Sequence, residues 1–451
     1  MAVALAAWRT TRRTAQSVIG ALRTREDERA PSYVDLIQIP VSHANNAQRL
    51  VATLSTNYHL CRIQAVSPTS VSMAQEGELD AGFFSLALGG QDVTSVSLTP
   101  MDTKGSSFCG QLTRATVVLG DGAELRLVVK RPPEDAQVAS ALSAMGMFSR
   151  ERLVYQEVLS CGRAAGVGPL LLGTAGDTLL LQDLAVGGFR AAPAGLLDAQ
   201  HAAAALRALA RLHAASLAVE AGLPGSLGRY SEVLFTEASR EYVQHFVQPN
   251  WRAVVDVVAT WDGYQKFADK LRAMEPAVID RAIEIVKPKD DELNVLTHGD
   301  FWKNNILFRY DPSSGDVIDA RVVDYQLSRF SSPSLDLNYF FHTSVENTVR
   351  RGHMPALVAE YVDTLNKQLE TYEVQRRVTV EEVERQMGDR LEFALLAACT
   401  DLRAAMSAPA DTVELSQLAS SGDSLTSLYH SESFKDVFSL MLLEFEQKGL
   451  L

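Results

Sequence analysis

The sequence predicts an α+β fold of two lobes: a small N-terminal lobe built on a β-sheet with one helix, and a larger, mainly helical C-terminal lobe. Short apolar runs separated by Gly-containing turns fill residues 90–185, which we expect to form the sheet lobe. Long Ala- and Leu-rich stretches with helical period follow in residues 190–451, and two further strands interrupt them around a polar loop. We treat residues 1–85 as an N-terminal extension, because their pattern is mixed.

Composition narrows the function classes. The 451 residues contain 42 Lys and Arg against 55 Asp and Glu, for a formal net charge of -13. This charge argues against nucleic acid as the main partner, since binding phosphates requires a positive surface. We expect no membrane span, because no run approaches the ~20 consecutive apolar residues needed. Four cysteines lie far apart in the sequence, which is typical of isolated thiols in a reducing compartment rather than of disulfides or a zinc site: Cys61, Cys109, Cys161 and Cys399.

The start of the chain has a composition of its own. Residues 1–25 contain five arginines and no acid, and acids then appear abruptly from Glu26. This pattern is typical of a mitochondrial presequence, but it also fits a solvated N-terminal arm. We favour the arm, and therefore expect a cytoplasmic protein, with a mitochondrial location as the alternative.

The small lobe begins with strand-like segments. Apolar and polar residues alternate at 96–98, and two strands at 111–119 and 124–130 flank a Gly-Asp-Gly turn. In the second of these, Leu125, Leu127 and Val129 lie on one face and Arg126, Val128 and Lys130 on the other. The pattern therefore predicts a lysine at the end of a sheet strand.

A helix and a hairpin complete the small lobe. In residues 147–159, Phe148, Glu151, Tyr155 and Val158 recur at three- and four-residue spacing, which predicts a helix. Two apolar runs between 169 and 184, joined by an Ala-Gly-Asp turn, predict a hairpin. Amphipathic helical stretches then recur to about residue 287.

The most informative segment is residues 293–308. A short apolar run enters a polar loop that contains His298, Asp300 and Asn305, and another apolar run leaves it. A turn at 311–316 leads to a further strand that ends at Asp324, so hairpin geometry should return Asp324 to the loop. A carboxylate near an acceptor hydroxyl, together with hard oxygen ligands for Mg²⁺, is what phosphoryl transfer from ATP requires. The spacing of Asp300 and Asn305 matches that of the kinase catalytic loop.

These motifs resemble those of the ecdysteroid kinase-like (CHK kinase-like) family, within the wider fold of aminoglycoside phosphotransferases, choline kinases and protein kinases. The resemblance rests on His-Gly-Asp-Phe-Trp-Lys-Asn-Asn-Ile-Leu-Phe at 298–308, Val-Asp-Tyr-Gln at 323–326 and Ser-Pro-Ser-Leu-Asp-Leu at 332–337. It extends over roughly residues 90–400 and implies a two-lobed protein-kinase-like fold. It also implies an ATP- and Mg²⁺-dependent phosphotransferase that acts on a small-molecule hydroxyl.

The resemblance assigns roles to individual catalytic residues. It implies that Lys130 contacts the α- and β-phosphates and that Glu151 is its helix partner, with Glu157 as the competing candidate. Asp300 would orient the acceptor hydroxyl and take its proton, and Asn305 and Asp324 would bind Mg²⁺. Strand-end lysines and helix-face glutamates are also common as solvated residues.

The resemblance implies a nucleotide site as well. The turn from Gly105 to Gly110 would cover the phosphates, although it would equally suit any tight strand connection. Val128 would form part of the ceiling above adenine. The segment with Gln182 and Leu184 would be the linker between the lobes, and a buried hairpin strand explains its apolar residues equally well.

Three more residues of the C-terminal lobe have supporting roles in this interpretation. Asp336 is expected to buttress the catalytic loop, His298 to orient it, and His213 to pack against its helix neighbours. Tyr325-Gln326 stands where protein kinases have Phe-Gly after the metal-binding Asp, and no Ala-Pro-Glu follows. We therefore expect no protein substrate.

The acceptor is expected to be a small, lipophilic, ecdysteroid-like alcohol. Aromatic residues beside the loop would supply apolar walls, whereas a polycation would require acids there: Phe301, Trp302, Tyr339, Phe340 and Phe341. The alternatives are a nucleotide-binding pseudokinase and a non-catalytic binder of apolar ligands.

Overall fold

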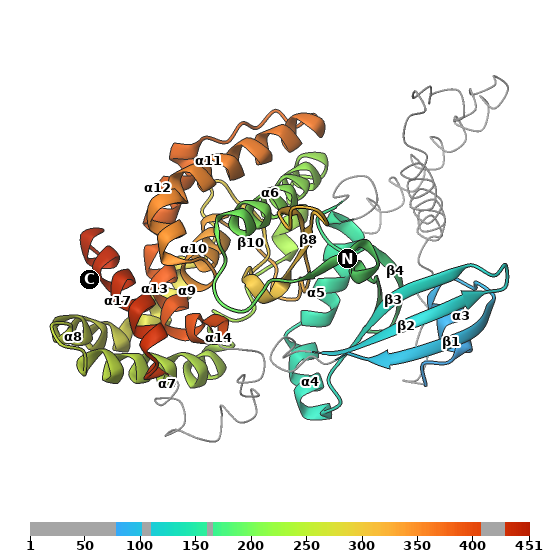
Figure 1. The fold of residues 1–451 in the computed structure, drawn as a ribbon, viewed down its shortest axis with the longest axis horizontal. Coiled ribbons are helices and arrows are strands. Elements are labelled where there is room, and N and C mark those ends of the chain that lie inside the picture. The colour runs from blue at the N-terminus through green and yellow to red at the C-terminus, as the bar shows by residue number, and fades with distance from the viewer. Residues whose placement is uncertain (1–77, 102–109, 160–165, 407–428) are drawn as a thin grey trace, which may run out of the picture. The chain divides into compact units, whose positions relative to one another are not determined.

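A computed structural model describes residues 78–101, 110–159, 166–406 and 429–451. The small lobe contains a five-stranded antiparallel sheet in the order β1-β2-β3-β5-β4. Its strands are β1 (Val93–Pro100), β2 (Gln111–Leu119), β3 (Glu124–Arg131), β4 (Leu171–Ala175) and β5 (Thr178–Gln182). Figure 1 shows the first three strands side by side, with the short helix α3 (Ala81–Ala87) next to them.

The face of this sheet that carries Leu125, Leu127 and Val129 is buried, as predicted. These side chains pack in one cluster with Phe84 of α3, whereas Val128, on the opposite face, is only half-buried. Because side chains alternate along a strand, this places Lys130 on the face with Val128. The observed strand register therefore agrees with the sequence pattern.

The small lobe has more helices than predicted. α5 (Met147–Leu153) continues into a π-helical turn, η2 (Val154–Val158), where one helix was expected. α3 and α4 (Ala136–Ala144) were not expected, so the prediction of a single helix is wrong although the α+β class is confirmed. α4 has few buried residues, with Leu142 the buried one, and Asp135 caps its start by accepting from the N–H groups of Gln137 and Val138. Such a helix has little of the apolar periodicity that sequence patterns detect.

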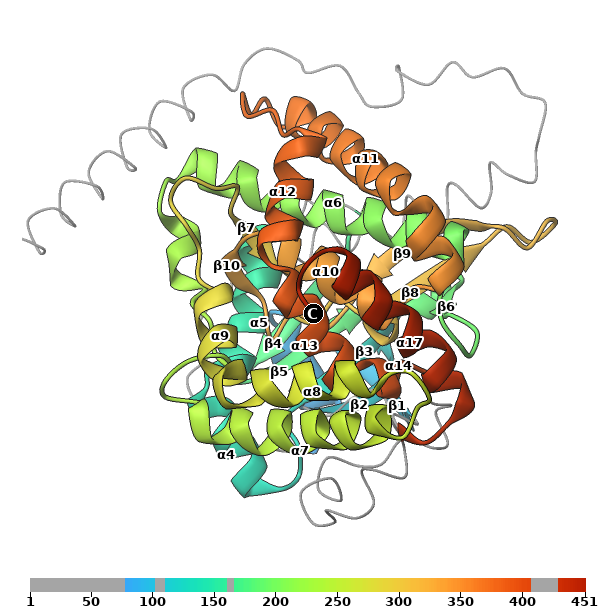
Figure 2. The ribbon, with the colours of Figure 1, turned by 90° about the vertical axis from the view of Figure 1, so that its left-hand side faces the viewer.

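The C-terminal lobe is mainly helical, as predicted. Figure 2 shows α6 and α11 side by side, and these two helices pack closely. The α-helices of this lobe are α6 (Ala199–Gly222), α7 (Arg240–Ala259), α8 (Gln265–Met274), α9 (Val278–Ile285), α10 (Ser334–Thr343), α11 (Asn347–Thr371), α12 (Val380–Asp389), α13 (Leu391–Thr400), α14 (Leu402–Met406) and α17 (Glu432–Gln447). Short 3-10 turns occur at η3 (Leu184–Gly187), η4 (Ser226–Arg229), η5 (Glu275–Ala277) and η6 (Lys303–Asn305).

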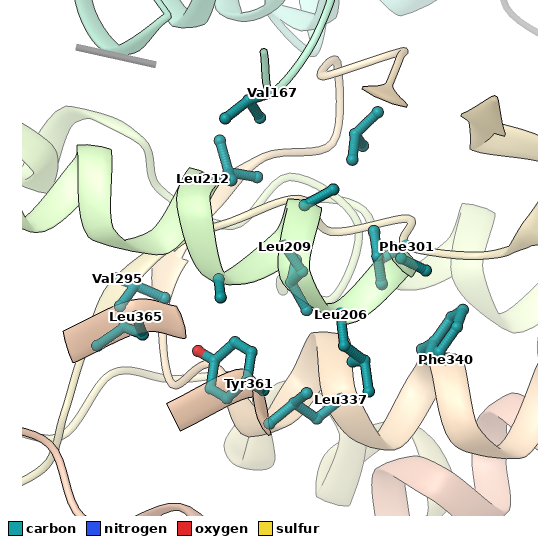
Figure 3. Close-up of a cluster of buried hydrophobic side chains, with 14 of the residues drawn as sticks. Val167, Leu206, Leu209, Leu212, Val295, Phe301, Leu337, Phe340, Tyr361 and Leu365 are labelled. Atoms are coloured by element: carbon teal, nitrogen blue, oxygen red, sulfur yellow. The ribbon is translucent and has the colours of Figure 1, made fainter. Parts of the chain in front are cut away.

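Helix α6 is the central element of the C-terminal core. Asp198 caps it by accepting from the N–H of His201. Figure 3 shows Leu206, Leu209 and Leu212 of this helix packed among the labelled residues of the core cluster. Among the described helices, α6 has the length and apolar composition to cross a membrane, but 72% of its most apolar window is buried inside the protein. Its apolar surface is therefore used in packing against neighbouring elements.

Two small sheets position the functional loop. β7 (Val295–Thr297) pairs with β10 (Arg329–Ser331), and β8 (Ile306–Tyr310) pairs with β6 (Phe189–Ala191) and β9 (Val317–Val322). The register pairs Ile306 with Val322, so the residue before β8 and the residue after β9 lie opposite each other. This hairpin is the one predicted from the sequence, and it returns the chain to the loop at residues 298–305.

Candidate active site

The loop between β7 and β8 is fixed by hydrogen bonds to its backbone. The carboxylate of Asp336, in the first turn of α10, accepts from the N–H of His298 at 2.6 Å and from the N–H of Gly299 at 2.9 Å. His213 of α6 contacts the same carboxylate through Nε2 at 3.1 Å, and its Nδ1 lies 2.7 Å from the hydroxyl of Tyr361. Asp336 therefore buttresses the loop, as predicted. His213 was expected only to pack against its neighbours, but it belongs to this hydrogen-bond network.

Gly299 occupies a position that accepts no side chain. Its φ is 84°, and a Cβ atom there would lie 2.0 Å from the carbonyl oxygen of Leu327. Such an approach is impossible for any residue except glycine. The glycine that replaces the arginine of the kinase motif is thus required by close packing between the loop and the segment after β9.

His298 is buried and orients the loop rather than facing solvent. Its Nε2 lies 3.0 Å from the carbonyl oxygen of Val323, and its Nδ1 accepts from the N–H of Asp300. Burial lowers the pKa of His298, although the carboxylate of Asp336 opposes this effect. A neutral imidazole that bridges the two segments is therefore consistent with the expected orienting role.

Asp300 and Asn305 are in direct contact. The Nδ2 of Asn305 donates to Oδ2 of Asp300 at 2.9 Å and to its carbonyl oxygen at 3.0 Å. On the other side, the hydroxyl of Tyr339 donates to Oδ1 of Asp300 at 3.1 Å. Burial, together with the negative charges of Asp324 and Asp401, raises the pKa of Asp300 to about 7. A carboxylate with a pKa near neutrality is suited to accept a proton.

Asp324 follows β9 and lies between Lys130 of the small lobe and the loop at residues 298–305. The N–H of Val323 donates to the carbonyl oxygen of Asn305 at 3.0 Å, which holds Asp324 beside the loop. Asp324 has a φ of 70°, a left-handed conformation that costs a non-glycine residue of the order of 1–3 kcal/mol. Strain of this kind is found mainly at functional sites, because the surrounding structure must impose it.

Lys130 connects the sheet lobe to this site. Its Nζ lies 2.8 Å from Oε2 of Glu151 and 3.0 Å from Oδ1 of Asp324, and the whole residue is buried. Burial alone would lower the pKa of Lys130, but the carboxylates of Asp324 and Glu151 outweigh it and raise the pKa. The ammonium group is therefore charged. Glu157 is the partner of Arg229 and Tyr230 instead, so the structure selects Glu151 of the two candidates.

Helix α5 is attached to the C-terminal lobe next to Glu151. Nη1 of Arg150 donates to the carbonyl oxygen of Ser328 at 2.7 Å. The rings of Tyr155 and Tyr325 meet edge to face, with centroids 5.3 Å apart. These contacts hold the helix, and thereby the carboxylate of Glu151, against the segment that follows Asp324.

The amide and carboxylate of this site fit a magnesium ion. Because Nδ2 of Asn305 is committed to Asp300, its Oδ1 is left as a possible ligand, and no described residue donates to it. In the described part of the chain, no three or more His, Cys, Asp or Glu side chains cluster as a self-sufficient metal site. Mg²⁺ usually binds through one or two protein oxygens, with substrate phosphates and water as the other ligands. Asn305 and Asp324 match that type of site.

The expected nucleotide residues are only partly covered by the structure. Gly105 lies outside the described residues. Gly110 lies at their edge, and a Cβ there would be 2.9 Å from the carbonyl oxygen of Arg131 and 3.6 Å from Cε of Lys130. Gln182 ends β5 opposite Leu127, and Leu184 begins the short turn η3. The chain passes from this part of the sheet into the C-terminal lobe. The residues that lie there are Val128, Gln182 and Leu184.

The aromatic residues beside the loop do not form the expected wall. Phe301, Phe340 and Phe341 are fully buried in the C-terminal core, and Figure 3 shows Phe301 and Phe340 within that cluster. Trp302 is only 6% exposed. Tyr339 alone of the five is half-buried, so the prediction of an apolar wall fails for the other four. Neighbouring aromatic residues in a sequence alternate around a helix or loop, and most of these face the core.

Three other residues on the Tyr339 side were not found from the sequence. The ring of Phe393 lies 6.4 Å from that of Tyr339, and Phe235 lies 6.0 Å beyond Phe393. Asp401 follows the same helix as Phe393, and burial raises its pKa to about 6. The segments that carry these residues are more than 50 residues from the loop in sequence. No local motif indicates that they approach it.

A family profile and a known protein match parts of this sequence. Residues 104–374, more than half of the chain, match the sequence profile of the ecdysteroid kinase-like family. A 65-residue segment is 32% identical to 4-hydroxytryptamine kinase from Psilocybe cyanescens, but this match spans 14% of the chain and 17% of that protein.

Similar solved structures are more distant. An ethanolamine kinase from Plasmodium vivax has 10% identity and a TM-score of 0.34, with 88% of this chain and 98% of that chain covered. A thermostable mutant of an aminoglycoside phosphotransferase has 15% identity and a TM-score of 0.30, with 78% and 99% covered.

Proposed function

Because the chain belongs to the ecdysteroid kinase-like family, we propose that it transfers the γ-phosphate of ATP to a hydroxyl group of a small molecule. The observation that carries this proposal is the position of Lys130, whose Nζ contacts Glu151 and Asp324 at once. This contact joins the sheet lobe to the hairpin that also positions Asp300. One site thus contains the ammonium group of Lys130, the carboxylates that hold it, the amide of Asn305 and the carboxyl group of Asp300, whose pKa is near 7. Phosphoryl transfer requires groups of these kinds.

Each residue has a defined task in this reaction. Lys130 binds the α- and β-phosphates, and Glu151 holds its ammonium in place. Asn305 and Asp324 would hold Mg²⁺, which neutralises the charge on the transferred phosphoryl group. Asp300 orients the acceptor hydroxyl and accepts its proton as the new P–O bond forms, while the bond from the γ-phosphorus to the bridging oxygen breaks and ADP leaves. Burial raises the pKa of Asp300 to about 7, close to the pH at which the enzyme would operate. A base with such a pKa accepts the proton more readily.

The site supports a lipophilic alcohol as the acceptor. Tyr339 contacts Asp300 through its hydroxyl, and its ring begins a row of aromatic side chains that continues through Phe393 to Phe235. Phe393 is itself buried, so the apolar surface that this row offers to an acceptor comes from the partly exposed rings of Tyr339 and Phe235. Apolar and aromatic linings with a few polar groups are typical of small-molecule sites.

An alcohol that also carries an amine is the second candidate. The carboxylate of Asp401 interacts electrostatically with Asp300 and Tyr339, so it lies on the acceptor side of the site. A nearby carboxylate would stabilise an ammonium group that has lost its hydration. The 65-residue similarity to a protein named 4-hydroxytryptamine kinase supports this alternative.

Steady-state kinetics with several acceptors tests the proposal. We expect a hydroxylated steroid or a comparable lipophilic alcohol to give a higher kcat/KM than choline or an aminoglycoside. The variant Asp401→Asn should reduce kcat/KM for an amino alcohol more than for a neutral acceptor, because only the amino alcohol also loses an ion pair. A protein that binds MgATP but phosphorylates no member of the panel would instead be a pseudokinase. One that binds apolar ligands without ATP would be a non-catalytic binder.

A further inference from the structure

The carboxylate of Asp300 is held at both oxygen atoms. Asn305 donates to Oδ2 from within the loop, and Tyr339 donates to Oδ1 from helix α10. The terminal torsion of an aspartate is broad and roughly two-fold, so a single donor leaves the carboxylate free to turn. Two donors on opposite oxygens fix its plane. The phenol therefore supplies the second restraint on the acid that is expected to receive the proton.

This arrangement leaves room for the acceptor. Each carboxylate oxygen carries about two lone pairs, and Tyr339 is the described residue that donates to Oδ1. The remaining lone pair on Oδ1 is available to a hydroxyl group of a bound molecule. A neutral donor also adds no charge to a site where Asp324 and Asp401 already surround Asp300.

Helix α10 joins this restraint to the support of the loop. Asp336, which binds the loop backbone, and Tyr339 are three residues apart on the same helix. Residues at that spacing lie on one face of a helix, so both side chains point to the loop. One rigid element thus fixes the backbone of the loop and the carboxylate that projects from it.

We propose that Tyr339 is a positioning residue whose hydroxyl orients the carboxylate of Asp300 toward the hydroxyl of the acceptor. The inference rests on the proposed function, because it assigns the acceptor side of the same site. It also changes the interpretation of Tyr339 from an apolar wall residue to a hydrogen-bond donor. The ring of Tyr339 packs beside Phe393 and so holds the hydroxyl in place.

Kinetics of Tyr339→Phe test this role. The variant keeps the ring and loses the hydroxyl, so kcat should fall about 10- to 100-fold through misplacement of the acid. The KM for MgATP should change by less than about threefold, because the nucleotide side of the site is intact. Tyr310→Phe, on β8, is the matched control, since it removes a half-buried hydroxyl that contacts His201 of α6, and its kcat should not change. An unchanged kcat in Tyr339→Phe overturns the inference.

Thermal unfolding provides a second test that does not depend on activity. The Tm changes of Tyr339→Phe and Asp300→Ala should be non-additive in the double variant, because both remove the same hydrogen bond. Additive changes would show that the two groups do not interact, and they would overturn the inference even if all variants fold. If the wild-type protein phosphorylates no alcohol, the proposed function is overturned. A fully active Tyr339→Phe variant of an active enzyme overturns only the role of Tyr339.

Discussion

Replacing Asp300 with asparagine should separate activity from stability. The substitution keeps the size of the side chain but removes its ability to accept a proton, so phosphoryl transfer should fall by about 10² to 10⁴. Affinity for MgATP should remain within a few fold, because Asp300 faces the acceptor. Turnover of an identified acceptor at the wild-type rate would show that the catalytic loop is wrongly assigned.

The same variant should be more stable than the wild-type protein at alkaline pH. Burial and the charges of Asp324 and Asp401 raise the pKa of Asp300 from 3.8 to about 7. A carboxyl group whose pKa is higher in the folded state stabilises the fold at low pH, and this stabilisation is lost as pH rises from about 4 through 7. Asparagine has no charge to bury, so it avoids this loss.

The size of the effect follows from the pKa shift. One pKa unit corresponds to about 1.4 kcal/mol, so a shift of about three units sets an upper bound near 4 kcal/mol. Asp300 is half-buried, and asparagine satisfies its two donors less well, which reduces the expected gain to about 1–2 kcal/mol. With an unfolding entropy of roughly 2 cal/mol/K per residue, this gain raises Tm by about 1–3 °C.

Thermal unfolding at pH 5 and pH 8 measures this gain. The Tm of Asp300→Asn should exceed that of the wild type at pH 8, and the difference should shrink at pH 5. Asp311→Asn is a surface control, because backbone N–H groups of Ser314 and Ser313 lower the pKa of Asp311. It should give no gain at pH 8. A lower Tm for Asp300→Asn at pH 8 would refute the reasoning about the buried charge.

Three other changes test separate parts of the structure. Asp324→Asn should weaken Mg²⁺-dependent ATP binding by about tenfold or more, and equal binding in titrations with and without Mg²⁺ would contradict its role as a ligand. Arg150→Met should cost about 1–3 kcal/mol in denaturant unfolding and raise the KM for ATP, because the carbonyl of Ser328 loses its donor and α5 loses an attachment; an unchanged KM would show that this bond does not position Glu151. A reporter fused to residues 1–25 should remain cytosolic in cells. Delivery of the reporter to mitochondria, and loss of that delivery when the arginines are replaced with Glu, would instead favour a presequence.

The parts of the site that lie in local motifs were predictable from sequence. The spacing of Asp300 and Asn305, and the turn that returns Asp324 to the loop, depend on short-range geometry that a hairpin pattern encodes. Lys130 could be placed because more and less buried positions alternate along its strand from Glu124 to Val129, and the strand ends just after it. The resemblance favours Glu151 as the partner of Lys130, but Glu157 stays a candidate in the sequence, since both lie on the same helical segment and only its packing against the C-terminal lobe decides which one meets Lys130.

The acceptor side was less predictable, because distant segments form it. Tyr339 reaches Asp300 only through the packing of α10 against the loop, and Phe393 and Asp401 come from α13 and the residue that follows it. Aromatic content near the loop suggested an apolar wall, yet packing turned Phe301 and Phe340 into the core. Composition identifies residues that could line a site, whereas the direction of each side chain is set by the tertiary structure.

Transfer of phosphate from ATP to a small alcohol at Asp300 is the proposed function of this protein. The most direct measurement incubates the full-length protein with Mg²⁺, γ-labelled ATP and a panel of lipophilic, choline-like and aminoglycoside alcohols, and identifies products by mass spectrometry. We predict that at least one lipophilic alcohol gains a single labelled phosphoryl group with the wild-type protein, and that Asp300→Asn produces at least about 100-fold less. Labelled product at equal rates from both proteins would contradict the role of Asp300, and MgATP binding with no phosphorylated alcohol from either would contradict the proposed function.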